Sequence, residues 1–140
     1  MSGNGHEKFT AIFAGGGTGG HLMPGLSVAE ELRRRYPDSR LVFVGTSSSL
    51  EKRLVERRGF EFRALPSVKF GNSALDMAGW AARAGGGLWA ARRLVRELNP
   101  QIIVSLGGHA ALAPSLAGVL AGVPLALMEQ NALPGKVSRV

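Results

Sequence analysis

Short apolar runs alternate with longer segments of helical periodicity along almost the whole chain of 140 residues. Five runs, rich in β-branched and aromatic residues, are expected to be strands: Phe9–Ala14, Leu41–Val44, Phe60–Leu65, Gln101–Leu106 and Pro124–Met128. Strands without a regular polar face are typical of parallel sheets that are buried on both sides. The alternation therefore predicts an α/β fold, a Rossmann-like parallel sheet with helices on both faces.

Four segments between these runs have apolar residues at helical spacing: Gly25–Tyr36, 47–58, Ala74–Leu98 and Ala110–Ala121. Pro24 is expected to open the first helix and Pro37 to end it. The three consecutive glycines Gly85–Gly87 predict a break in the long third helix. Residues 134–140 predict the beginning of a helix that the chain does not complete.

Composition limits the class of protein. Hydrophobic residues make up 45% of the chain and charged residues 19%, which indicates a globular domain over residues 9–140 behind a flexible polar tail, 1–8. The tail does not resemble a secretion signal, and no apolar run reaches the roughly 20 residues of a membrane span. The chain has no cysteine, which excludes disulfides and thiolate metal sites.

The net charge of +7 favours anionic partners, namely nucleic acid, phosphorylated small molecules or an anionic membrane surface. No nucleic-acid-binding motif and no aromatic residues interleaved with the cations on strands are found, so nucleic acid is not an expected partner. The chain has only two aspartates, Asp38 and Asp76, and no D-x-D pair, so no metal site is expected.

A glycine-rich loop, Gly15–His21, follows the first predicted strand. Glycines there allow a tight turn and bring backbone N–H groups close to an anion at a helix N-terminus. The loop matches the dinucleotide pattern G-x-G-x-x-G, but the second strand ends in Val44-Gly45-Thr46-Ser47 without the acidic residue that would hold a ribose. Five glycines among six residues exceed what helix packing needs, which favours a loop that faces a ligand.

Three motifs are each placed at or after a predicted strand: GGGTGGHLMPGLSVAEEL over residues 15–32, Ile103–Gly108, and Glu129-Gln130-Asn131 with Pro134-Gly135. Together they resemble the MurG family of glycosyltransferases. The first is similar to the family's opening signature, the second resembles its second glycine-rich turn, and the third resembles its E-Q-N-x-x-P-G segment. The resemblance implies the GT-B architecture of two Rossmann-like domains. This chain would be the N-terminal, acceptor-side half, without the C-terminal donor domain.

The resemblance also implies a reaction. Family members move N-acetylglucosamine from UDP-GlcNAc to undecaprenyl-pyrophosphoryl-MurNAc-pentapeptide with inversion, need no cofactor, and work at the cytoplasmic face of the bacterial cell membrane as peripheral proteins. Eight residues would bind substrate, the first four of them on the donor: Thr18, Gly19, Gly20, Asn131, Gly107, Gly108, His109 and Lys69.

Two residues are candidates for the catalytic base, His21 and Glu129. His21 is equally well explained as a helix cap or a residue that orients the ligand, and Glu129 as a carboxylate that holds backbone amides. The sequence does not decide between these roles.

The chain departs from the family at three places. His109 replaces the usual tyrosine, Met128 replaces a common histidine, and the loop 67–72 keeps only Lys69 of a basic motif. Two alternatives therefore stay open: a divergent glycosyltransferase with another lipid acceptor, and a non-catalytic nucleotide-binding module.

Tryptophan and arginine lie side by side in the segment Ala74–Leu98: Trp80, Arg83, Trp89, Arg92 and Arg93. This combination suits the headgroup region of an anionic membrane, where a lipid-linked acceptor would be found. The competing interpretation is a core helix with a solvated basic face.

Overall fold

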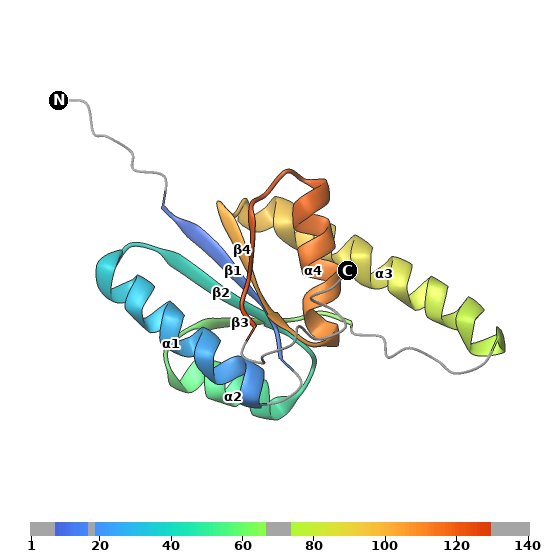
Figure 1. Cartoon of the computed structure of the whole chain (residues 1–140), viewed down its shortest axis with the longest axis horizontal. Coiled ribbons are helices and arrows are strands. Elements are labelled where there is room, and N and C mark those ends of the chain that lie inside the picture. The colour runs from blue at the N-terminus through green and yellow to red at the C-terminus, as the bar shows by residue number, and fades with distance from the viewer. Residues whose placement is uncertain (1–7, 17–18, 67–73, 130–140) are drawn as a thin grey trace.

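The computed structural model describes residues 8–16, 19–66 and 74–129, and Figure 1 shows their arrangement. Strands and helices alternate along the described chain: β1 Thr10–Gly15, α1 Gly19–Arg35, β2 Arg40–Gly45, α2 Ser49–Arg57, β3 Glu61–Ala64, α3 Ala74–Leu98, β4 Ile102–Gly107, α4 His109–Leu120 and β5 Leu125–Leu127. The strands form one sheet in the order β3-β2-β1-β4-β5, and every neighbouring pair is parallel. The predicted α/β fold is confirmed.

Each face of the sheet has its own hydrophobic core, because successive residues of a strand point to opposite sides. Phe13 of β1 faces a core that α1 and α2 cover, whereas its neighbour Ile12 faces a core that α3 and α4 cover (Figure 1). The Phe13 and Phe43 rings stack across β1 and β2 with their centroids 4.9 Å apart. Burial on both faces explains why the strands are almost continuously apolar in sequence.

The first helix begins at Gly19 rather than at Gly25, so the prediction that Pro24 opens it is wrong. Pro24 lies inside α1, where proline removes a backbone donor and disfavours the helix. Leu22 and Leu26, one turn apart, are both fully buried against the sheet. Their packing holds the first turn of α1 in helical geometry and offsets the cost of the proline.

The third helix is continuous, so the predicted break at Gly85–Gly87 is also wrong. Each glycine lowers helix propensity by about 1 kcal/mol relative to alanine, but packing elsewhere can outweigh this. The carboxyl half of α3 is fixed by buried residues at helical spacing: Ala91, Leu94, Val95 and Leu98. The amino-terminal half extends away from the sheet (Figure 1), and no other atom lies within 4 Å of a Cβ placed on Gly85 or Gly86.

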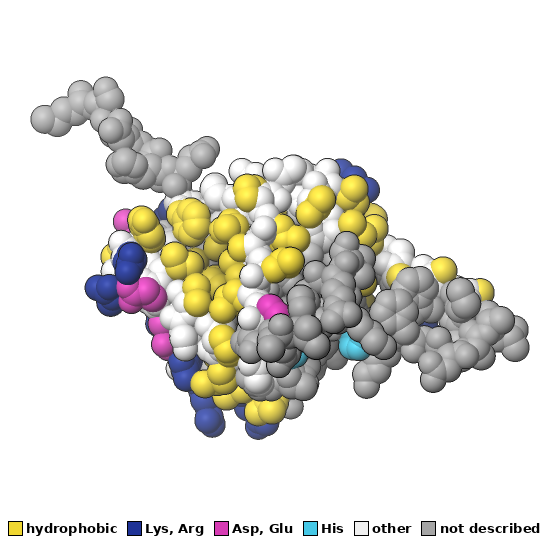
Figure 2. Space-filling model, in the orientation of Figure 1, with side chains coloured by type: hydrophobic (Ala, Val, Ile, Leu, Met, Phe, Trp, Pro, Cys, Tyr) yellow, Lys and Arg dark blue, Asp and Glu magenta, His cyan; other side chains and the backbone are white. Residues whose placement is uncertain are grey.

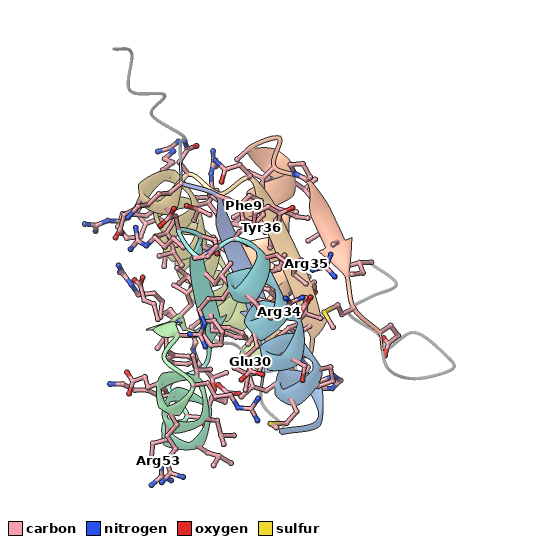
Figure 3. The ribbon with its side chains drawn as sticks, turned by 90° about the vertical axis from the view of Figure 1, so that its left-hand side faces the viewer. Phe9, Glu30, Arg34, Arg35, Tyr36 and Arg53 are labelled. Carbon is pink, nitrogen blue, oxygen red and sulfur yellow. The ribbon has the colours of Figure 1, made fainter. Side chains whose placement is uncertain are left out.

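Helix α1 is tied to its neighbours along its carboxyl half, which Figure 3 shows from the side. The Arg33 guanidinium donates to the carbonyl oxygens of Arg58 and Gly59, at the end of α2, over 3.0 and 3.4 Å. Tyr36 lies near Phe9, with ring centroids 6.1 Å apart. These contacts help to fix the position of α1 relative to α2 and to the start of β1.

Two sequence predictions fall outside the described residues, namely the polar tail over residues 1–7 and the incomplete helix over 134–140. Among the helices that the structure describes, none combines the length and apolar character needed to cross a membrane.

Candidate functional site

The order in which strands are added to the sheet reverses at β1, although all of the strands are parallel. From β1 it proceeds to β2 and β3 on one side, and then returns to β4, which lies on the other side of β1. In open α/β sheets, ligands bind at such a switch point, outside the carboxyl ends of the strands. Two glycine turns lie there. The first glycine turn is Gly15–Gly16, at the end of β1, and the second is Gly107–Gly108, which joins β4 to α4.

The two glycine turns pack backbone against backbone. A Cβ on Gly15 would lie 2.6 Å from the carbonyl oxygen of Gly107, and one on Gly108 would lie 2.7 Å from the carbonyl oxygen of Gly16. Gly108 also has φ +80°, a conformation that residues with a side chain rarely adopt. Close approach therefore requires glycine on both turns, which accounts for the two motifs seen in the sequence.

His21 lies at the junction of these turns. It is half-buried in the first turn of α1, and its Nδ1 is 3.6 Å from the position where Gly107 would carry a Cβ. His109 is exposed and is the first residue of α4, directly after the second glycine turn. The structure thus brings the two histidines to the ends of adjacent strands.

Two helices begin at the carboxyl ends of these adjacent strands, α1 after β1 and α4 after β4. Neither helix has an acidic residue in its first turn, and the N-cap residue of α4 is Gly108, which makes no side-chain cap hydrogen bond. The first N–H groups of a helix lack partners within the helix and carry partial positive charge. Such a pair of amino termini favours an anion, and a diphosphate has the appropriate charge and acceptor oxygens.

Glu51 is part of this site, although it is not among the residues predicted from the sequence. Its side chain is buried, with 4% of the residue exposed, and its Oε2 accepts hydrogen bonds from the Thr46 backbone N–H at 3.1 Å and the Thr46 hydroxyl at 2.9 Å. A Cβ on Gly16 would overlap its carboxylate. The spacing Ser48-x-x-Glu51 is that of a helix capping box, which was the available signal in the sequence.

The other predicted substrate and catalytic residues have different placements. Gly19 and Gly20 form the first turn of α1, beside the glycine turns. Glu129 is half-buried just beyond β5, one strand further along the same edge of the sheet, where the Met128 N–H donates to the Ser105 carbonyl at 2.8 Å. Three predicted residues lie outside the described part of the chain: Thr18, Lys69 and Asn131.

The residues predicted to contact a membrane lie in two separate regions of α3. We define the basic face of α3 as Trp89, Arg92, Arg93 and Arg96, which line one open hollow of about 270 Å³. Trp89 is 65% exposed, and the Arg93 guanidinium lies 5.8 Å from the centre of its ring. Arg83 is exposed earlier on the helix, near Gly79, and the Trp80 side chain is outside the described part. Trp89 is therefore no core residue.

Within residues 8–16, 19–66 and 74–129, no three histidine, aspartate or glutamate side chains gather in an arrangement that could hold a metal ion.

The fold and the glycine turns define a glycosyltransferase-like Rossmann domain, and comparison with known proteins agrees. The model of the glycosyltransferase family 28 N-terminal domain matches residues 11–140, so the chain belongs to this family. The predicted resemblance to MurG-type enzymes is confirmed by relatives that bear the corresponding name.

One such relative is the UDP-N-acetylglucosamine--N-acetylmuramyl-(pentapeptide) pyrophosphoryl-undecaprenol N-acetylglucosamine transferase of Desulforudis audaxviator, which is 45% identical over 131 residues. The protein of the same name from Nitratidesulfovibrio vulgaris is 43% identical over 129 residues. Both alignments cover 92% of this chain, but only 35% and 34% of the relatives. The chain therefore spans about a third of their length.

The crystal structure of Acinetobacter baumannii MurG superposes on 94% of this chain with a TM-score of 0.77 and 24% sequence identity, and the match covers 38% of that structure. At this identity the comparison supports the fold, which is that of the N-terminal half of a GT-B glycosyltransferase.

Proposed function

We propose that this chain is the acceptor-side domain of an inverting glycosyltransferase that moves N-acetylglucosamine from UDP-GlcNAc to undecaprenyl-pyrophosphoryl-MurNAc-pentapeptide, in peptidoglycan synthesis. The observation that carries the proposal is the pair of glycine turns packed together at the β1–β4 switch point, each followed by the amino terminus of a helix. A diphosphate leaving group gains negative charge during transfer, and helix amino termini stabilise such charge without having to reorganise.

The chemistry needs one proton acceptor. The acceptor hydroxyl oxygen bonds to the anomeric carbon while the bond from that carbon to the UDP oxygen breaks, and the hydroxyl proton passes to a base. His21 is the favoured base, because its side chain lies against the second glycine turn, where the diphosphate is proposed to bind. Glu129, one strand further along the edge, is the alternative.

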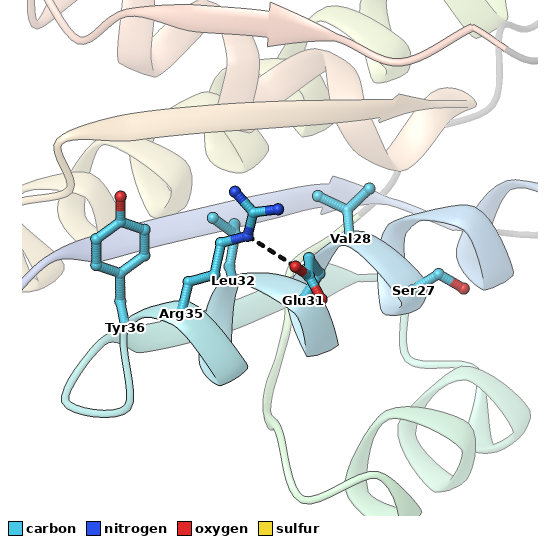
Figure 4. Close-up of a pocket in the computed structure, with 6 residues that line it drawn as sticks. All are labelled: Ser27, Val28, Glu31, Leu32, Arg35 and Tyr36. Carbon is cyan, nitrogen blue, oxygen red and sulfur yellow. Dashed lines mark hydrogen bonds and ion pairs between the residues drawn. The ribbon is translucent and has the colours of Figure 1, made fainter.

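A donor-binding domain is needed to complete the proposed enzyme. The chain spans about a third of its relatives, and one face of the sheet presents apolar surface around β5 and α1 (Figure 2). On α1, a groove of about 450 Å³ is lined partly by Val28, Leu32 and Tyr36 (Figure 4). On the edge strand β5, Leu125 and Leu127 are 36% and 55% exposed. Contiguous apolar surface of this kind is typical of contact with further polypeptide.

The proposal also includes peripheral attachment to the cytoplasmic face of the membrane through α3. Arginines near an anionic lipid surface each contribute about 1 kcal/mol, and an exposed tryptophan is suited to the headgroup region. The basic face of α3 combines both on a helix whose opposite side is buried in the core.

Transfer of radiolabelled N-acetylglucosamine from UDP-GlcNAc to the lipid-linked muramyl-pentapeptide tests the proposal. We expect transfer by a polypeptide that joins this chain to a donor-binding domain, and none by the 140-residue chain alone. Turnover by the isolated chain would contradict the two-domain requirement. Binding of UDP-GlcNAc by the joined polypeptide without transfer to any lipid-linked sugar would favour a non-catalytic nucleotide-binding module. Transfer to a different lipid acceptor alone would identify a divergent glycosyltransferase, in keeping with His109 and Met128.

A further inference from the structure

Glu51 connects three elements beneath the proposed ligand site. It belongs to α2, bonds Thr46 at the end of β2, and fills the space beside Gly16 at the end of β1. A Cβ on Gly45 would lie 2.8 Å from its Oε2, so the end of β2 is also packed against the carboxylate. The Glu51 carboxylate therefore occupies the space that side chains at positions 16 and 45 would need, and it faces the first glycine turn.

A capping role does not explain this placement. Ser48 is the N-cap residue of α2, and a glutamate three residues later would normally accept a hydrogen bond from the N-cap N–H. Here the Ser48 N–H donates instead to the Thr46 hydroxyl at 3.3 Å, while Oε2 of Glu51 accepts from Thr46. Thr46 thus lies between the helix terminus and the carboxylate, and the other oxygen, Oε1, faces Gly16.

We propose that Glu51 is a positioning residue that holds the first glycine turn against the second and thereby sets the location of His21. The contacts form a continuous path: Glu51 packs on Gly16, the Gly16 carbonyl packs on Gly108, and the neighbouring Gly107 packs on His21. A buried carboxylate is a rigid support for such a turn, because both of its oxygens are constrained by packing or hydrogen bonds. The consequence for ligand binding rests on the proposed function.

Glu51→Gln is the most informative variant. The glutamine Oε1 can keep the bonds from Thr46, so an N–H donor then replaces the oxygen that faces Gly16. Glu56→Gln is the matched control, because Glu56 lies on the same helix but is exposed and pairs only loosely with Lys52, at 3.9 Å.

NMR spectra of the chain give a readout that does not depend on the proposed function. We expect Glu51→Gln to shift the amide resonances of both glycine turns and the imidazole resonances of His21, with the melting temperature within about 4 °C of the wild type. Glu56→Gln should leave these resonances unchanged. Unshifted glycine turns in Glu51→Gln, or shifts spread evenly over the whole sheet, would overturn the proposal.

Should Glu51→Gln fail to fold, Thr46→Val provides a second test, since it removes the hydroxyl donor and keeps the carboxylate. The resonances of the glycine turns and of His21 should shift in this variant as well. If these resonances do not shift, the proposal is overturned. In the polypeptide joined to a donor-binding domain, Glu51→Gln should weaken UDP-GlcNAc binding by about 10-fold, as for loss of one well-placed interaction. Shifted turns with unchanged donor affinity would support the positioning role and contradict the proposed function.

Discussion

The glycine turns and the basic face of α3 are both suited to anions, but they are built in different ways. The turns bring together residues from β1, α1, α2 and β4, and their backbones lie so close that a Cβ on Gly15 or Gly108 would come within 3 Å of a carbonyl oxygen of the other turn. The basic face consists of four residues from successive turns of one helix, which contact solvent. A convergent site can recognise one ligand by shape, whereas a single-helix surface recognises charge. We therefore expect a nucleotide sugar at the first and a membrane at the second.

The largest effect is expected where the two glycine turns touch. Gly108→Ala should lower the free energy of unfolding by about 3 kcal/mol, because it combines a strained backbone conformation with a collision against the Gly16 carbonyl. Gly122→Ala is the matched control, since Gly122 has a similar φ of +75° but no other atom within 4 Å of the added Cβ.

Gly122→Ala should lower the free energy of unfolding by about 1 kcal/mol, which is the contribution of backbone strain alone. Urea denaturation of the three proteins measures the difference. Equal losses for the two variants would mean that the added methyl group meets no collision at Gly108, which would contradict the close packing of the two turns.

The next effect concerns the proposed catalytic base beside the glycine turns. In a polypeptide that joins this chain to a donor-binding domain, His21→Ala should lower kcat by ~10²-fold, the usual scale for a lost general base. Glu129→Gln, measured in parallel, tests the alternative base. A change confined to KM would assign His21 to binding instead of proton transfer. If neither variant lowers kcat, the base lies outside this domain.

A smaller effect is expected at the basic face of α3. Replacing Arg92 and Arg93 by glutamine should weaken binding to phosphatidylglycerol vesicles by ~30-fold, which corresponds to about 1 kcal/mol for each cation. Replacing Arg34 and Arg35 on α1 is the control, because hydrogen bonds from these two residues to Glu31 lower the pKa of that carboxyl to about 2 and occupy both cations.

Co-sedimentation at low and high salt measures the binding of each variant. Higher salt should reduce the arginine contribution, because the Debye length shortens. Equal binding of the chain to phosphatidylglycerol and phosphatidylcholine, or equal losses for both double variants, would contradict a membrane-binding role of this face.

The sequence predicted the features that depend on local composition. The strands follow from runs such as Ile103–Leu106, and the glycine turns follow from clusters of glycine directly after strands. The start of α1 was misplaced because the burial of Leu22 depends on packing against the sheet, which outweighs the local effect of Pro24. Glu51 was missed because its role depends on the proximity of Gly16, which is distant in sequence.

Hydrogen exchange of the joined polypeptide tests the central claim most directly, since it measures both regions in one experiment. UDP-GlcNAc should protect the amides around Gly107, Gly108 and the first turn of α1, and leave the exchange of residues 81–98 of α3 unchanged. Phosphatidylglycerol vesicles should protect α3 and leave the glycine turns unchanged. Protection of α3 by UDP-GlcNAc, or no protection of either glycine turn at saturating ligand, would contradict the assignment of the nucleotide-sugar site to the β1–β4 switch point.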